Sequence, residues 1–81
     1  MDVAAVESTT LAMVGYDKSN GLLQLGFRSG AVYEYGGVPE AVHEALMEAP
    51  SKGGYFNRFI RGRFPYWLAS RGDGSGAWRE R

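Results

Sequence analysis

Two glycine turns divide residues 9–35 into three strand-length segments, and this spacing constrains the fold more than any other feature of the sequence. The first turn contains Asn20-Gly21, a dipeptide typical of a chain reversal because both positions tolerate a positive φ. Ser29-Gly30 forms the second turn. The three segments are rich in residues that suit a pleated surface, and they cover residues 9–16, 22–28 and 31–35. We therefore predict a three-stranded antiparallel β-meander.

The length of the second loop decides which way two tyrosines point. A two-residue loop of Ser29 and Gly30 would require a positive φ at Ser29, which its Cβ disfavours. A three-residue loop over residues 28–30 requires a positive φ only at Gly30, as in a type I turn closed by a G1 bulge. We predict the three-residue loop, which places Tyr33 and Tyr35 on the apolar face beside Leu25 and Leu23.

The following residues predict two helices. Apolar residues recur at helical spacing over residues 38–49, and Pro50 ends this first helix. Ser51 can cap a second helix with residues 52–54 as its first turn, and Gly62 suits the end of that helix. We expect its apolar stripe to comprise Phe56, Phe59 and Ile60, and we expect packing from Phe64, Tyr66, Trp67 and Leu68 after it.

The predicted fold is α+β, a three-stranded antiparallel β-meander followed by two helices (β-β-β-α-α). Residues 9–68 form the domain. Residues 1–8 lack any period, so we expect a loose N-terminal segment or a ragged edge, and residues 69–81 predict a flexible C-terminal tail. Three strands leave two open edges, so self-association into a homo-oligomer is also expected.

Several classes of function are excluded or disfavoured. The chain has no cysteine and a single histidine, His43, so neither a thiolate site nor a histidine metal cage is possible. No serine has a credible His–Asp partner, and no carboxylate pair indicates acid–base chemistry. No apolar run could span a membrane, and the start lacks the basic region of a signal peptide. We expect a non-enzymatic cytoplasmic protein with no metal, cofactor or membrane partner.

The two halves of the chain carry opposite charge. Nine Lys and Arg balance nine Asp and Glu, yet residues 1–50 hold only two of the cations and seven of the acids. Residues 51–81 reverse these numbers, and no acid lies between Ala49 and Gly72. Such asymmetry points to an anionic partner. The alternative is that the basic segment neutralises the acidic half of the same chain.

The start of the second helix and the arginines after it form the candidate site. Glycines at a helix start leave backbone N–H groups open to a phosphate, although they could equally serve close packing on the sheet. Arginines bind phosphate oxygens in two-pronged fashion. The predicted nucleic-acid or anion-binding residues are Lys52, Gly53, Gly54, Tyr55, Asn57, Arg58, Arg61, Arg63 and Tyr66.

Aromatic residues supply further candidate contacts. Tyr33 and Tyr35 could form a base-stacking platform, although the predicted register favours a place in the core. Tyr55, Tyr66 and Trp67 lie beside the arginines in sequence and are better candidates for stacking.

Several spaced motifs resemble the KTSC domain. This domain is named for its occurrence at the C-terminus of some lysyl-tRNA synthetases, and it also occurs alone in small bacterial and phage proteins. The resemblance covers about residues 9–66 and implies a compact domain with a central Tyr-x-Tyr, here Tyr33 and Tyr35, and a suggested role in RNA binding. The matching motifs are Gly15-Tyr16-Asp17, Phe27-Arg28-Ser29-Gly30, Tyr33-Glu34-Tyr35, Val38-Pro39, Ser51-Lys52-Gly53, Tyr55-Phe56-Asn57 and Ile60-Arg61-Gly62-Arg63-Phe64-Pro65-Tyr66.

Three functions follow as hypotheses. The first is a binding module that contacts RNA or another nucleic acid through the arginine and aromatic segment. The second is a protein that sequesters a small nucleotide-like anion, at the second helix's N-terminus or at a subunit interface. The third is a protein-interaction or oligomerisation module whose arginines only pair with its own acidic half.

Overall fold

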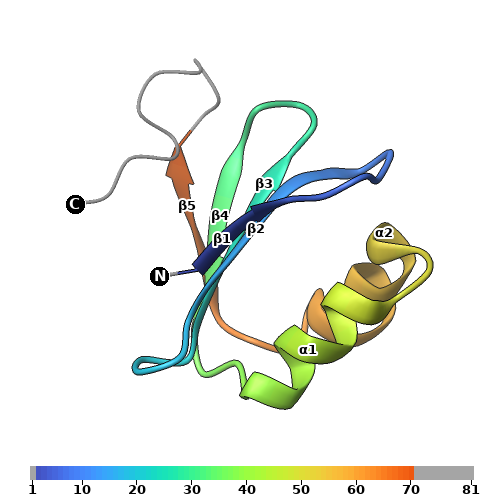
Figure 1. The fold of residues 1–81 in the computed structure, drawn as a ribbon. Helices are drawn as coiled ribbons and strands as arrows, with labels where there is room; N and C mark the ends of the chain where they lie inside the picture. The colour runs from blue at the N-terminus through green and yellow to red at the C-terminus, as the bar shows by residue number, and fades with distance from the viewer. Residues whose placement is uncertain (1, 71–81) are drawn as a thin grey trace.

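Five strands form one antiparallel sheet in the computed structural model, which describes residues 2–70 (Figure 1). The strands are adjacent in the order of the sequence: β1 (Asp2–Ala5), β2 (Leu11–Asp17), β3 (Leu22–Phe27), β4 (Val32–Tyr35) and β5 (Tyr66–Ser70). Three helical segments separate β4 from β5 and lie on one face of the sheet: α1 (Glu40–Glu48), α2 (Lys52–Tyr55) and the π-helix η1 (Phe56–Ile60).

The predicted α+β fold with an antiparallel sheet and two helices is confirmed, but the sheet has five strands and not three. The additional strands are the two edges. β1 arises from the segment predicted to be loose, and β5 follows the helices and reaches Ser70, inside the predicted flexible tail. The rest of that predicted tail, residues 71–81, lies outside the described residues. Short edge strands are defined by pairing with a neighbour more than by their own residues, which explains why both were missed.

The predicted loop between β3 and β4 is confirmed. Leu23 pairs with Tyr35 and Leu25 pairs with Tyr33. Gly30 has a φ of 101°, and every residue with a positive φ within residues 2–70 is a glycine. The Gly30 N–H also donates to the Phe27 carbonyl at 2.8 Å, which closes the turn. Self-association remains a prediction, with β1 and β5 now the edges of the described sheet.

The core lies between the sheet and the helices. It includes Leu11, Leu23, Leu25, Leu46 and Ile60, all fully buried. The predicted apolar stripe of the second helix is only partly correct, because Phe59 is 47% exposed. Phe56 and Ile60 do face the core, since the π-helical turn puts them on the same side.

The start of α2 packs tightly against the sheet. Ser51 caps it as predicted, its Oγ accepting from the Gly54 N–H at 3.1 Å. Gly53 is buried, and a Cβ at this position would lie 2.7 Å from Thr10 Oγ1 and 3.0 Å from Thr10 Cβ. This contact supports the alternative given for the glycine pair, in which Gly53 permits close packing.

We expect Gly53→Ala to lower the free energy of unfolding by about 1–2 kcal/mol, because overpacking outweighs the gain in helix propensity. Gly54→Ala is the control, since its Cβ would meet only Ser51, at 3.0 Å from Oγ and 3.4 Å from Cβ, which is a less severe approach than at Gly53. Urea unfolding of both variants measures the difference. An equal effect of the two changes would argue against tight packing at Gly53.

The structure contains no helix long and apolar enough to cross a membrane within residues 2–70.

Candidate functional site

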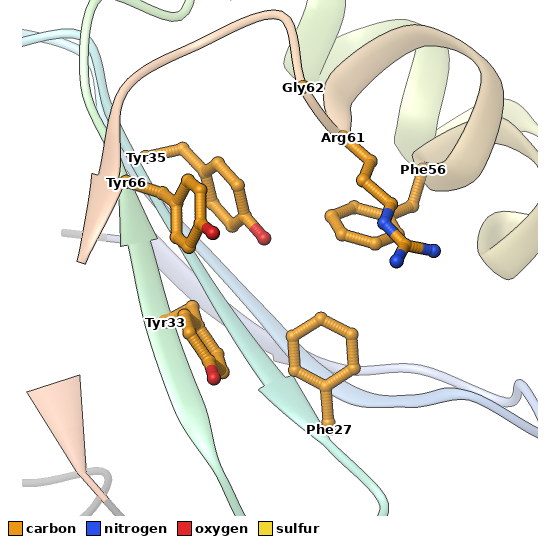
Figure 2. Close-up of a pocket in the computed structure, with 7 residues that line it drawn as sticks. All are labelled: Phe27, Tyr33, Tyr35, Phe56, Arg61, Gly62 and Tyr66. Carbon is orange, nitrogen blue, oxygen red and sulfur yellow. The ribbon is translucent and has the colours of Figure 1, made fainter. Parts of the chain in front are cut away.

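A pocket of about 360 Å³ opens between the sheet and the end of the helical segment (Figure 2). This volume is at the lower end of the range for small-molecule sites, so it suits one small organic group. Five of its seven lining residues are aromatic. The complete lining is Phe27, Tyr33, Tyr35, Phe56, Arg61, Gly62 and Tyr66.

Three tyrosines from β4 and β5 form one wall of the pocket. Tyr33 and Tyr35 share a face of β4 because side chains alternate along a strand, and Tyr66 pairs with Tyr35 across to β5. The rings of Tyr35 and Tyr66 stack with centroids 5.6 Å apart, and Tyr33 lies 5.8 Å from Tyr66. Tyr35 is 4% exposed and Tyr66 is 58% exposed, so the wall runs from the core to the surface.

Two phenylalanines and an arginine form the opposite wall. Phe27 ends β3 and Phe56 begins η1, and their rings meet edge to face at 5.4 Å. Arg61 is exposed and lines the pocket together with Phe56, on the side opposite the tyrosines (Figure 2). The two walls touch, since Phe27 meets Tyr33 edge to face at 5.9 Å and Phe56 meets Tyr35 at 5.8 Å, and Arg61 adds a positive charge to the second wall.

The π-helical turn places Arg61 at this pocket. The Arg61 N–H donates to the Phe56 carbonyl five residues earlier at 2.8 Å, and the backbone becomes extended at Arg61. Gly62 then reverses the chain with a φ of 77°. Because π-helical turns often occur at functional sites, this local geometry marks the pocket as a candidate site.

The hydroxyl of Tyr35 is available to a ligand. No residue in the described part of the chain hydrogen-bonds to it, whereas the Tyr16 hydroxyl donates to the Val38 carbonyl at 2.6 Å. Burial, followed by the neighbouring Tyr66 and Tyr33, raises the pKa of Tyr35 to about 12, and Arg61 acts in the opposite direction. Tyr35 therefore keeps its proton at neutral pH, and its hydroxyl can donate a hydrogen bond to an acceptor.

No arginine forms an ion pair with a carboxylate within residues 2–70. The ion pair in this part of the chain joins Lys18 Nζ and Glu40 Oε2 at 3.6 Å. Arg61 Nη1 donates to Asn57 Oδ1 at 3.4 Å, and Arg63 Nε donates to the Arg58 carbonyl at 3.3 Å. The Arg58 guanidinium lies 5.9 Å from the centre of the Phe59 ring. The described residues thus do not show the basic segment pairing with the acidic half.

The predicted site residues separate into two groups. Tyr33, Tyr35, Arg61 and Tyr66 line the pocket, and the exposed Asn57, Arg58 and Arg63 lie in the same segment of the chain as Arg61 but outside the lining. The second group, Lys52 to Tyr55, forms α2. The Lys52 Nζ donates to the Ala49 carbonyl at 3.1 Å, and the Gly54 N–H donates to Ser51. Gly53 is buried, and the Tyr55 ring packs on Phe59.

Trp67 belongs to neither group. It follows Tyr66 on β5, and neighbouring strand residues face opposite sides of a sheet. Its indole N–H donates to Glu34 Oε1 at 2.7 Å, and Glu34 Oε2 accepts from Gln24 at 2.9 Å. Trp67 is thus tied to the face of the sheet that turns away from the pocket.

Three residues of the pocket were missed at the sequence level: Phe27, Phe56 and Gly62. Phe56 and Phe59 were assigned to one apolar stripe, and Gly62 to the helix stop alone. A signal existed for Phe27, because the predicted register puts it on the face that carries Tyr33.

Comparison with known proteins identifies the family. The KTSC domain matches residues 7–64, which is most of the chain. The chain belongs to the KTSC domain family. The crystal structure of a KTSC domain protein from Yersinia pestis is similar, with a TM-score of 0.83 and 36% sequence identity, covering 85% of this chain and 97% of that one. The resemblance noted from the motifs is therefore confirmed.

Relatives of this KTSC domain fall into two kinds. A lysine–tRNA ligase of Nostoc punctiforme is 43% identical over 60 residues, which span 74% of this chain and 11% of the ligase. An uncharacterized protein of Stutzerimonas stutzeri is 40% identical over 68 residues, which span 83% of this chain and 96% of that protein. The chain thus spans about a tenth of the ligases it matches and nearly all of a small relative.

The family match also covers most of the pocket. Six of its seven lining residues lie within residues 7–64, and Tyr66 lies two positions beyond.

Proposed function

We propose that this KTSC domain is a non-catalytic module that binds single-stranded RNA. One observation carries the proposal: Arg61 lines an aromatic pocket, the same segment of the chain carries two more exposed arginines, and none of the three forms an ion pair within the described residues. The arginines are Arg58, Arg61 and Arg63. An RNA-binding role is consistent with a cytoplasmic location.

Both halves of the site match the chemistry of an RNA strand. Guanidinium groups bind phosphate oxygens with two parallel hydrogen bonds. Exposed aromatic rings such as Tyr66 and Phe59 stack on bases, each stack being worth about 1–3 kcal/mol. A single strand offers unstacked bases to such rings, whereas a duplex keeps its bases inside.

The relatives support RNA as the ligand class. The relatives from Nostoc punctiforme and Trichormus variabilis are lysine–tRNA ligases, and by their name tRNA is the substrate of those enzymes. Ligase activity is not proposed for this chain, because it matches only 11% of such an enzyme. The pocket lining holds no carboxylate, histidine or thiol that would act as an acid–base group or nucleophile, which supports a binding role.

Salt dependence tests the proposal. With three arginine–phosphate contacts, the affinity for a single-stranded RNA should fall roughly twentyfold between 50 and 200 mM salt, because each contact releases counterions. Fluorescence anisotropy with a labelled 12-nucleotide RNA measures this change, and the same sequence in a duplex is the control. Binding that does not change with salt, or a preference for the duplex, would contradict the proposal.

A further inference from the structure

The tyrosine wall offers hydroxyl groups that a ligand in the pocket could bind. Tyr33, Tyr35 and Tyr66 lie in a row on β4 and β5, and no described residue hydrogen-bonds to their hydroxyls (Figure 2). Tyr35 matters most because its side chain is more than nine-tenths buried while its hydroxyl is not sealed inside the protein. Because this hydroxyl opens into the pocket and no described residue accepts from it, it can donate to an acceptor that a ligand supplies.

Arg61 supplies a second donor group on the other side of the pocket. The hydroxyl ends of Tyr35 and Tyr66 point toward the side on which Arg61 lies (Figure 2). Arg61 is exposed and its hydrogen bond to Asn57 is long, at 3.4 Å, so most of its guanidinium donors remain open. The pocket therefore offers one donor at depth, several at the rim and aromatic rings between them.

We infer that the pocket holds one unstacked nucleotide, whose base lies on the open side of the pocket against the tyrosine row. In this arrangement the Tyr35 hydroxyl donates to an acceptor on the base, and Arg61 binds the phosphate at the rim. The volume of about 360 Å³ admits one such group and not a longer stretch of chain. This inference rests on the proposed function and specifies it, since a free nucleotide and a nucleotide of an RNA strand offer the same chemistry.

Calorimetric titration with nucleoside monophosphates, the matching nucleosides and inorganic phosphate tests the inference. We expect a monophosphate to bind more tightly than its nucleoside or phosphate alone. Tyr35→Phe removes only the hydroxyl and should weaken monophosphate binding about tenfold. Tyr16→Phe is the matched control, because its hydroxyl bonds to the Val38 carbonyl and lies outside the pocket lining. That change should leave nucleotide affinity unaltered.

The two proposals fail in different ways. If the 12-nucleotide RNA binds but Tyr35→Phe changes neither RNA nor monophosphate affinity, the pocket inference is overturned and RNA binding stands. If monophosphates bind in a Tyr35-dependent manner but RNA does not, RNA binding fails and the pocket is a site for free nucleotides. Inorganic phosphate binding as tightly as a monophosphate would overturn the base-binding arrangement.

Discussion

Replacing Arg58, Arg61 and Arg63 together with alanine is expected to weaken binding of single-stranded RNA about a hundredfold at 50 mM salt. Each arginine contributes a charge-assisted contact to a phosphate, and these contacts dominate affinity at low salt. The slope of log affinity against log salt should fall by about 2, because three phosphate contacts are lost. Anisotropy titrations at several salt concentrations give both quantities.

Lys18→Ala is the charge control for this experiment. Lys18 is exposed and pairs with Glu40 at 3.6 Å, an exposed ion pair that contributes little to stability. Removing it takes away one positive charge outside the pocket, so RNA affinity and salt slope should remain within about twofold of the original values. A loss of affinity in Lys18→Ala as large as the loss per arginine in the triple variant would show that binding depends on net charge and not on this surface.

Local turn chemistry explains why the centre of the sheet could be predicted. Gly30 is the only position of its loop that accepts a positive φ without strain, and this fixes the loop length. Loop length then fixes the register, so Tyr33 and Tyr35 had to lie beside Leu25 and Leu23. Everything needed for that argument lies within a few residues along the chain.

β5 could not be predicted in the same way. Tyr66–Ser70 follows Pro65 and a run of arginines, and nothing in these residues alone distinguishes a strand from a packed segment. Its extended form comes from pairing with β4, including a register shift between Val32 and Tyr33. That partner lies more than thirty residues away along the chain. Long-range pairing of this kind leaves little trace in local sequence.

The pocket was missed for a related reason. Arg61 and Tyr66 were predicted as binding residues, but nothing in the sequence indicates that Arg61 faces the wall formed by Tyr35 and Tyr66. Their meeting depends on the five-residue hydrogen bond from Arg61 to Phe56, which belongs to a π-helical turn. An ordinary helical repeat puts Phe56, Phe59 and Ile60 in one stripe, and this is why Phe59 was assigned to the core.

The π-helical turn buries Phe56 and exposes Phe59, so we expect substitutions of these two residues to differ strongly in their effect on stability. Phe56 is 6% exposed and packs against Phe27 and Tyr35, so Phe56→Ala should lower the free energy of unfolding by about 3–5 kcal/mol. Such a loss is a large fraction of the stability of a small domain. Phe59 is 47% exposed, and Phe59→Ala should cost less than about 1 kcal/mol. Urea unfolding followed by circular dichroism measures both.

For RNA binding we expect Phe59 to matter, although it contributes little to stability. Phe59→Ala should remain folded and bind RNA about tenfold more weakly, because an exposed ring available for base stacking is lost. Phe59→Tyr keeps the aromatic face and should restore affinity, which separates stacking from loss of bulk. If Phe59→Ala unfolds the domain while Phe56→Ala does not, the π-helical turn is misplaced. Arg61, which that turn positions, would then no longer face the tyrosine wall.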